Sequence, residues 1–372
     1  RRAYQPFPFA AKRLPMRTAT GEQIDAKTAR YLKFGGKQDV TIAPHQTVFS
    51  DALKYNLRPL QRLAVTIHYG SMPKTVTTHR GSRTNSYIMQ GEAKPKQPFA
   101  VGEQLEHWYT IAAIDVETDG TADCIALLGN SITDGRGSAT NQQNRWADVL
   151  SRRLLDNEPT RNVAVLNMGI GGNCVLSGGL GPTASSRYRR DLLGQEGVRW
   201  IILFEAVNDL GNAANGEQTA QQIIDVYKQI IREAHQQGIR VFGATITPFK
   251  NSSYYNASHE KGRQKINNWM LSTKMLDGVI DFAAAVCNPQ DSEALQQQYL
   301  FQNDWLHLNA SGYEAMGHSV DLSLFTQTGP LAADEDEEQS LPDEGLTSNL
   351  PIIIINTEAA INADEKVRGT MK

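Results

Sequence analysis

The pattern of hydrophobic and polar positions changes twice along the chain. In residues 1–115 short runs alternate between apolar and polar residues, and Gly and Pro separate these runs. Alternation with a period of two is typical of a half-buried β-strand. We therefore predict a small antiparallel β domain over residues 1–115, with strands at 40–43, 63–69 and 107–111.

Residues 116–328 combine short, continuously apolar runs with amphipathic helical patterns. The clearest helix is at 219–237, where apolar side chains recur every three or four residues and Gly238 gives a normal stop. Strands that alternate with helices predict right-handed crossovers and a parallel sheet covered by helices on both faces. Ligands of such sheets bind beyond the carboxyl ends of the strands. The expected strands are 124–128, 163–167, 200–205, 240–246 and 279–282.

The last part of the chain has a different composition. Residues 329–349 are rich in Asp, Glu, Ser and Pro, which predicts a solvated acidic linker. The apolar run at 350–355 predicts a strand. This strand either docks on a sheet edge or opens a further domain over 350–372 that the sequence truncates. Residues 350–371 resemble the start of a spore-coat-protein-H-like domain.

Composition narrows the class of protein. The 372 residues are 40% hydrophobic and 21% charged, which is typical of a soluble globular protein with a sizeable core. A net charge of −3 argues against a nucleic-acid partner. No apolar run is long enough for a membrane span. The chain does not begin with Met, and we expect a processed sequence from which a signal peptide could have been removed.

The three cysteines, Cys124, Cys174 and Cys287, show no metal-binding spacing, and we expect neither a metal nor a cofactor. Because their number is odd, at least one thiol is free or pairs outside the chain. The simplest interpretation is that they are buried and unpaired.

Two motifs follow the first two expected strands of the parallel sheet. Residues 129–135 (GNSITDG) place Ser131 at a tight turn, where Gly129 and Asn130 tolerate unusual backbone angles. An ordinary strand-to-helix turn would have the same composition. Residues 167–173 (NMGIGGN) form a glycine run whose backbone N–H groups can approach a substrate oxygen, as acyl transfer requires. A plain glycine loop or a phosphate cradle is the alternative, whereas the spacing does not fit a dinucleotide fingerprint.

Two further motifs complete the set. Residues 205–209 (EAVND) end the third strand, where Asn208 can donate to an oxyanion and Asp209 can cap the following turn. Residues 304–307 (DWLH) place Asp304 three positions before His307 in one loop. A serine hydroxyl needs an adjacent base, and a carboxylate holds the base in its productive tautomer. The other histidines lack this arrangement and are interpreted as surface or packing residues: His45, His68, His79, His107, His235, His259 and His318.

Taken in order, the four motifs resemble those of the SGNH/GDSL hydrolases over residues 121–325. Arg145-Trp146, residues 243–249 and Asp281-Phe282 look similar to a secreted bacterial and fungal branch of that family, in which a β-rich segment precedes the hydrolase domain. Residues 32–112 are similar to that segment. The resemblance implies an α/β, flavodoxin-like three-layer parallel sheet (the SGNH hydrolase fold) behind the N-terminal antiparallel β domain.

The resemblance also assigns roles to residues. Ser131 matches the nucleophile, His307 the base and Asp304 its orienting carboxylate. Gly172 and Asn208 match two oxyanion-hole donors, a backbone N–H and a side-chain amide, and the N–H of Ser131 is the third. The implied activity is that of a serine esterase acting through an acyl-enzyme.

The sequence departs from the family pattern at two positions. Asn130 replaces the usual Asp of the GDS signature, outside the triad. Ala206 replaces the usual Gly two residues before the asparagine, which puts the geometry of the oxyanion hole in question. The chain has no GxSxG motif, which disfavours the nucleophile-elbow architecture.

The substrate remains open at this stage because fold and triad do not determine it. No long apolar lid segment is visible, which favours short acyl groups, including acetyl esters of carbohydrate. The expected partner is a small ester or an acylated polysaccharide, and the resemblance implies a secreted, periplasmic or cell-surface protein. The alternatives are a lipase or acylhydrolase for longer acyl chains and a non-catalytic carbohydrate-binding relative. The oligomeric state stays open.

Overall fold

The structure, a computed structural model, describes residues 9–12, 14–20, 23–44, 46–72, 74–91, 102–334, 355–357 and 369–371. The chain divides into two compact units, residues 1–332 and 333–372. In the second unit β18 (Ile355–Thr357) pairs antiparallel with β19 (Gly369–Met371). Most of the predicted linker at 329–349 and of the predicted strand at 350–355 lies outside the described residues, and the predicted domain boundaries stay predictions.

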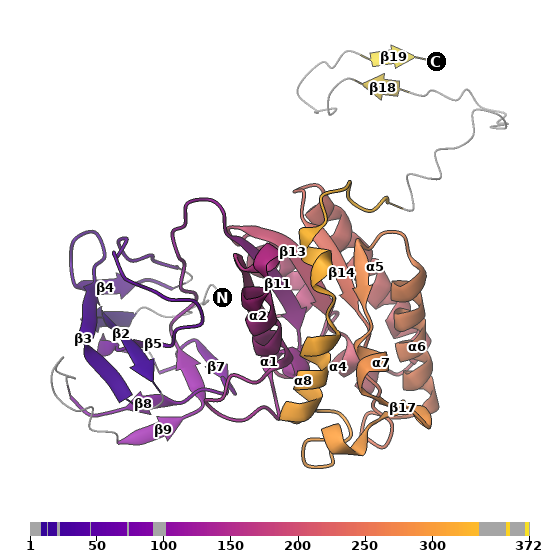
Figure 1. Ribbon diagram of the computed structural model, residues 1–372, viewed down its shortest axis with the longest axis horizontal. Coiled ribbons are helices and arrows are strands. Elements are labelled where there is room, and N and C mark those ends of the chain that lie inside the picture. Colours follow the sequence, from indigo (N-terminus) through magenta and orange to yellow (C-terminus); the bar gives the residue numbers. More distant parts are fainter. Residues whose placement is uncertain are drawn as a thin grey trace. The chain divides into compact units, whose positions relative to one another are not determined.

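A five-stranded parallel sheet forms the centre of the first unit, in the order β12-β11-β13-β14-β15 (Figure 1). Each strand lies within two residues of its predicted ends, because buried parallel strands are continuously apolar. The prediction of a parallel α/β sheet is confirmed. The strands are β11 (Asp123–Gly129), β12 (Val163–Gly169), β13 (Val198–Phe204), β14 (Arg240–Ala244) and β15 (Gly278–Ile280).

Helices cover both faces of this sheet (Figure 1). Successive side chains of β11 point to opposite faces. Ala126 and Leu128 therefore belong to the core under α5 and α6, whereas Ile125 and Leu127 belong to the core under α2 and α8. The α-helices are α1 (Ser131–Asp134), α2 (Trp146–Asp156), α3 (Ala184–Tyr188), α4 (Val207–Gly211), α5 (Gly216–His235), α6 (Ala257–Ser272), α7 (Phe282–Val286) and α8 (Ala310–Ser319).

Helix α5 follows the periodicity that predicted it. Its buried side chains include Ile223, Tyr227 and Ile231, which recur every four residues on one face. The Asn215 side chain caps its first turn by accepting from the N–H of Gln218. The helix ends at His235, and Gly238 follows in the left-handed region at φ +72°. The predicted helix is confirmed, with its ends shifted by two or three residues.

Short elements join these larger ones. A π-helical turn (Arg189–Leu193) continues α3, and 3-10 turns lie at Glu158–Thr160, Gln297–Tyr299 and Leu322–Thr326. The hairpin of β16 (Cys287–Asn288) and β17 (Asp291–Leu295) follows α7. Among the described residues, no helix combines the length and apolar character needed to cross a bilayer.

The strands that precede β11 pair antiparallel, as predicted, in small sheets of two or three strands. One sheet has the order β4-β1-β6 and another β3-β2-β5, and β10 pairs with β7 and β8 with β9. The strands are β1 (Phe9–Lys12), β2 (Leu14–Thr20), β3 (Gln23–Leu32), β4 (Asp39–Ile42), β5 (Leu63–Val65), β6 (His68–Ser71), β7 (Thr78–Arg80), β8 (Ser86–Ile88), β9 (Glu103–Leu105) and β10 (His107–Tyr109).

The prediction of one strand over 63–69 is wrong. The segment contains two strands, β5 and β6, which hydrogen-bond to different sheets through β2 and β1. The alternating pattern continues across residues 66 and 67, so periodicity alone could not show where the chain changes partner.

Candidate active site

The loop after β11 presents Ser131. An added Cβ on Gly129 would collide with the Thr133 side chain, so residue 129 must be glycine for lack of space. The Asn130 side chain caps the single turn α1 by accepting from the N–H of Ile132 at 3.0 Å. Neither residue has a positive φ. Asn130, at φ −101° and ψ −148°, lies outside the helical and extended regions, as expected, and close packing explains Gly129.

Ser131, His307 and Asp304 meet beyond the carboxyl end of the sheet. The Oγ of Ser131 lies 2.8 Å from Nε2 of His307, across 176 positions of the chain. The Nδ1 of the same ring lies 2.7 Å from Oδ2 of Asp304. Ser131 and His307 are both buried. A hydroxyl, an imidazole and a carboxylate joined in this order can activate the hydroxyl oxygen as a nucleophile.

Backbone bonds hold the Asp304 carboxylate in place. Its Oδ1 accepts from the N–H of His307 at 2.8 Å and from the N–H of Leu306 at 3.0 Å. Trp305, between Asp304 and Leu306, lies in the left-handed region at φ +56°, which closes the turn. Burial raises the pKa of the Asp304 carboxyl, but the hydrogen bonds from His307 and the backbone outweigh it and hold that pKa below its ordinary value. The carboxylate is thus ionised at neutral pH.

The predicted oxyanion donors lie at the ends of β12 and β13. Gly172 has φ +69°, and the side chain of Leu180 packs beside its α-carbon. The amide of Asn208 donates to the carbonyl of Asn173 at 2.8 Å and accepts from the hydroxyl of Tyr254 at 3.1 Å. These two bonds fix the orientation of the amide and leave one of its hydrogens for another acceptor. Tyr254 was not singled out from the sequence, because it lies 46 positions from Asn208.

Asp209 holds the loop that follows Gly172. Its two carboxylate oxygens accept from the N–H groups of Val175 and Leu176 at 2.8 and 2.9 Å. The sequence pattern allows Asp209 to cap the turn after it. The carboxylate bonds instead to a loop 33 and 34 positions away and so joins the segment of Gly172 to that of Asn208.

Ala206 has a backbone conformation that favours glycine. Its φ is +98° and its ψ is −20°, and its side chain is buried. Strain of this kind costs about 1–3 kcal/mol. This chain thus has a methyl group where the family pattern has glycine. The resulting backbone strain lies two residues before Asn208.

We expect Ala206→Gly to change the free energy of unfolding by less than about 1 kcal/mol, because relief of strain offsets the lost methyl burial and the added chain entropy. The matched control is Ala220→Gly, another fully buried alanine but inside helix α5. There the same change should destabilise by about 1.5–2 kcal/mol, from helix propensity and methyl burial together. Urea denaturation of both variants measures the difference, and equal losses would contradict it.

Glu205 is buried directly before Ala206. Burial raises the pKa of its carboxyl well above the ordinary value, although the positive charge of Arg187 acts in the opposite direction. The Arg187 guanidinium donates to Asp191 at 3.1 Å and to backbone carbonyls, so its charge is shared with another acid. A carboxyl with a raised pKa in the folded state lowers stability as the pH rises above its ordinary value.

We expect Glu205→Gln to flatten the fall of the melting temperature between pH 5 and pH 8. The unfolded chain ionises Glu205 freely in this range, whereas the folded chain resists ionisation, so wild type loses stability as pH rises. The variant should melt higher than wild type at pH 8, and the gap should narrow towards pH 5. Glu196→Gln, at an exposed position, is the control and should keep the wild-type slope. Parallel wild-type and Glu205→Gln curves would contradict the expectation.

Other candidate features include none of these residues. A depression of about 590 Å³ is lined by Asn144, Tyr299, Ala310, Ser311, Glu314, Ala315 and His318, and it includes none of the predicted site residues. Within the described ranges, no three His, Cys, Asp or Glu side chains are placed to hold a metal ion. All three cysteines are unpaired, but only Cys174 is fully buried. Burial raises the pKa of Cys174 to about 12, which makes it a poor nucleophile at neutral pH.

Residues 127–315 match the model of the GDSL-like lipase/acylhydrolase family. No curated protein matches the chain.

The chain resembles solved structures, among them the following three. A member of the lipolytic protein G-D-S-L family from Veillonella parvula has 16% identity and a TM-score of 0.40, over 56% of this chain and 100% of that one. An acetylxylan esterase from Geobacillus stearothermophilus, solved as a catalytic mutant, has 15% identity and a TM-score of 0.41, over 54% and 93%. A GDSL-like lipase from Bacteroides thetaiotaomicron has 16% identity and a TM-score of 0.39, over 55% and 88%.

Proposed function

The chain belongs to the GDSL-like lipase/acylhydrolase family, and on that premise we propose that it hydrolyses esters of short acyl groups with Ser131 as its nucleophile. Family membership makes the protein an ester-hydrolysing enzyme. The observation that carries the residue assignment is the continuous chain of contacts from Ser131 Oγ through the His307 ring to Asp304, at 2.8 and 2.7 Å.

The proposed reaction has two steps. The Nε2 of His307 takes the proton of Ser131 while Oγ attacks the ester carbonyl, and Asp304 stabilises the resulting imidazolium. The oxyanion accepts from the N–H groups of Ser131 and Gly172 and from the free amide hydrogen of Asn208. The alcohol leaves with the proton from His307, and water then hydrolyses the acyl-enzyme by the same route.

A preference for short acyl groups is supported by the surroundings of the site. A longer acyl chain binds more tightly only where a continuous apolar surface covers it, because each buried CH₂ contributes about 0.8 kcal/mol. Beside Gly172 lies the apolar side chain of Leu180, a residue with 59% of its surface accessible. The neighbouring residues Gly178, Gly179 and Gly181 add no side chains, and we infer that this loop contacts only a few carbons of an acyl group. An acetyl group on a carbohydrate is a substrate of this size.

A chain-length series of p-nitrophenyl esters tests the proposed substrate class. We expect kcat/KM to be highest for acetate or butyrate and to fall at least about tenfold by octanoate, because the additional methylenes stay in water. A parallel assay on acetylated xylan and on deacetylated xylan measures acetate release from carbohydrate. A maximum at octanoate or longer would overturn the short-acyl proposal in favour of a lipase.

A further inference from the structure

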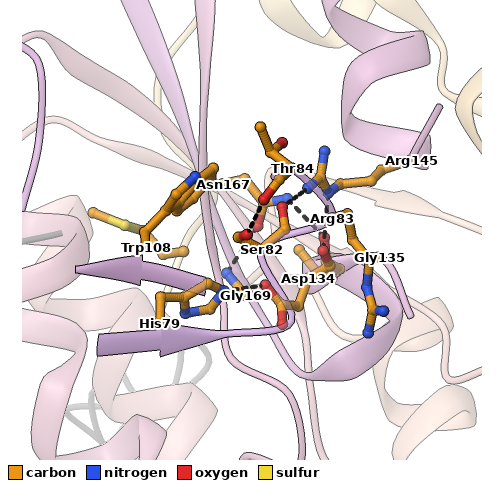
Figure 2. A network of polar contacts seen from close by, with 12 residues as sticks. His79, Ser82, Arg83, Thr84, Trp108, Asp134, Gly135, Arg145, Asn167 and Gly169 are labelled. Atoms are coloured by element: carbon orange, nitrogen blue, oxygen red, sulfur yellow. Dashed lines mark hydrogen bonds and ion pairs between the residues drawn. The ribbon is translucent and has the colours of Figure 1, made fainter. Parts of the chain in front are cut away.

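An additional histidine contacts the nucleophile turn from the N-terminal β-rich segment. The Nε2 of His79, in β7, lies 2.5 Å from Oδ1 of Asp134, the last residue of α1 (Figure 2). Both side chains are largely buried, with 12% and 8% of their surfaces accessible. A buried contact of this length between an imidazole and a carboxylate is stronger than an exposed pair, because solvent screens it less.

Asp134 lies between the two halves of the proposed site. Its N–H donates to the carbonyl of Asn130 at 2.8 Å and closes the turn that carries Ser131. On the other side, an added Cβ on Gly171 would lie 3.4 Å from Oδ2 of Asp134, next to the segment that presents Gly172. The position of Asp134 therefore affects both the nucleophile and an oxyanion donor.

Arg145, directly before α2, links the backbone of Asp134 to the same segment. The Nε of Arg145 donates to the Asp134 carbonyl at 2.9 Å, and its Nη2 donates to the carbonyl of Ser82 at 2.5 Å. The ring of Trp108 packs beside that of His79, with 5.7 Å between centroids (Figure 2). Residues 79–82 thus hold Asp134 by its side chain directly and by its carbonyl through Arg145.

The turn α1 needs such support. It contains four residues, and an isolated helical turn is unstable in water because nucleation fixes several dihedral angles for one hydrogen bond. Catalysis also requires that Ser131 Oγ be held within a fraction of an ångström of its productive position.

We propose that His79 is a positioning residue, through which the N-terminal β-rich segment completes the active site by fixing Asp134 and the Ser131 turn. This inference rests on the proposed esterase function. It predicts that loss of the His79 contact lowers the chemical step, whereas substrate binding changes little.

Two amide substitutions of His79 form the test. The amide nitrogen of glutamine falls about where the imidazole Nε2 lies, whereas the shorter asparagine cannot reach Asp134. We expect His79→Asn to lower kcat for p-nitrophenyl acetate by about 10- to 100-fold with KM changed less than about threefold, and His79→Gln to recover most of the loss. His79→Phe keeps a ring beside Trp108 but removes the donor, and it should behave like His79→Asn.

A second histidine–aspartate pair supplies the matched control. The Nε2 of His235, at the end of α5, lies 2.8 Å from Oδ2 of Asp277, directly before β15, with 14% and 1% of the side chains accessible. This pair lies at the amino-terminal edge of the sheet, away from Ser131. His235→Asn should lower the melting temperature but leave kcat within about threefold of wild type, since it removes a bond of the same type elsewhere.

Three results would overturn the inference: unchanged kcat in both His79→Asn and His79→Phe, an equal loss in His79→Gln, or an equal loss in His235→Asn. Labelling with a fluorophosphonate probe separates this from a failure of the proposed function. If Ser131 is unlabelled in wild type, the esterase assignment fails. If wild type is labelled and every His79 variant is labelled at the same rate, only the positioning role fails.

Discussion

Ser131→Ala is expected to lower kcat for p-nitrophenyl acetate by about 10⁴-fold or more, because the proposed acyl-enzyme cannot form without the hydroxyl oxygen. The fold should be retained, since the Oγ of Ser131 contacts the His307 ring at 2.8 Å and removal of one small polar atom leaves the packing of α1 unchanged. The measurement is steady-state kinetics with pure enzyme, together with the melting temperature.

The matched control for this substitution is Ser151→Ala. Ser151 lies in α2, and its hydroxyl donates to the carbonyl of Ala147 at 2.9 Å, away from the predicted site residues. The activity of Ser151→Ala should stay within about threefold of wild type, because substitutions away from the core and the active site usually have small effects. If Ser131→Ala retained more than a few per cent of wild-type activity, another group would have to be the nucleophile.

Asp304→Asn is expected to lower kcat by about 10³- to 10⁴-fold with little loss of stability. The Oδ1 of asparagine can still accept from the N–H groups of Leu306 and His307, so the turn should persist. The amide nitrogen would then face Nδ1 of His307, and the imidazole would have to carry its proton on Nε2. In that tautomer Nε2 can no longer accept the proton of Ser131.

Asp321→Asn is a suitable control, because Asp321 also accepts from a backbone N–H, that of Ser323, in a loop before a 3-10 turn. It should leave kcat unchanged within about threefold. Equal activity of Asp304→Asn and wild type would mean that the ring of His307 needs no carboxylate to set its tautomer.

The strands and the chain positions of the site could be predicted from the sequence. Buried parallel strands leave continuous apolar runs, and the four polar motifs each follow or adjoin such a run. The structure brings Ser131, Asp304 and His307 into contact as the motif order suggested. Their catalytic roles stay predictions until the variants are measured.

The contacts that support the site could not be predicted in this way. His79 was grouped with the surface and packing histidines, because its partner is 55 positions away and its strand has three residues. Asp209 and Tyr254 reach other segments through side-chain bonds that leave no periodic signal. The positive φ of Ala206 was also invisible, since alanine rarely adopts it.

The separation of 176 residues between the Ser131 and His307 contacts has a consequence for folding. Closing a loop of that length costs conformational entropy, which only the contacts of the completed sheet offset. Parallel strand pairings of this kind also form slowly. No shorter stretch of the chain brings the hydroxyl and the imidazole together. During refolding, ester hydrolysis would therefore appear only after the last strands have joined. The time at which activity appears would then report when the fold is complete.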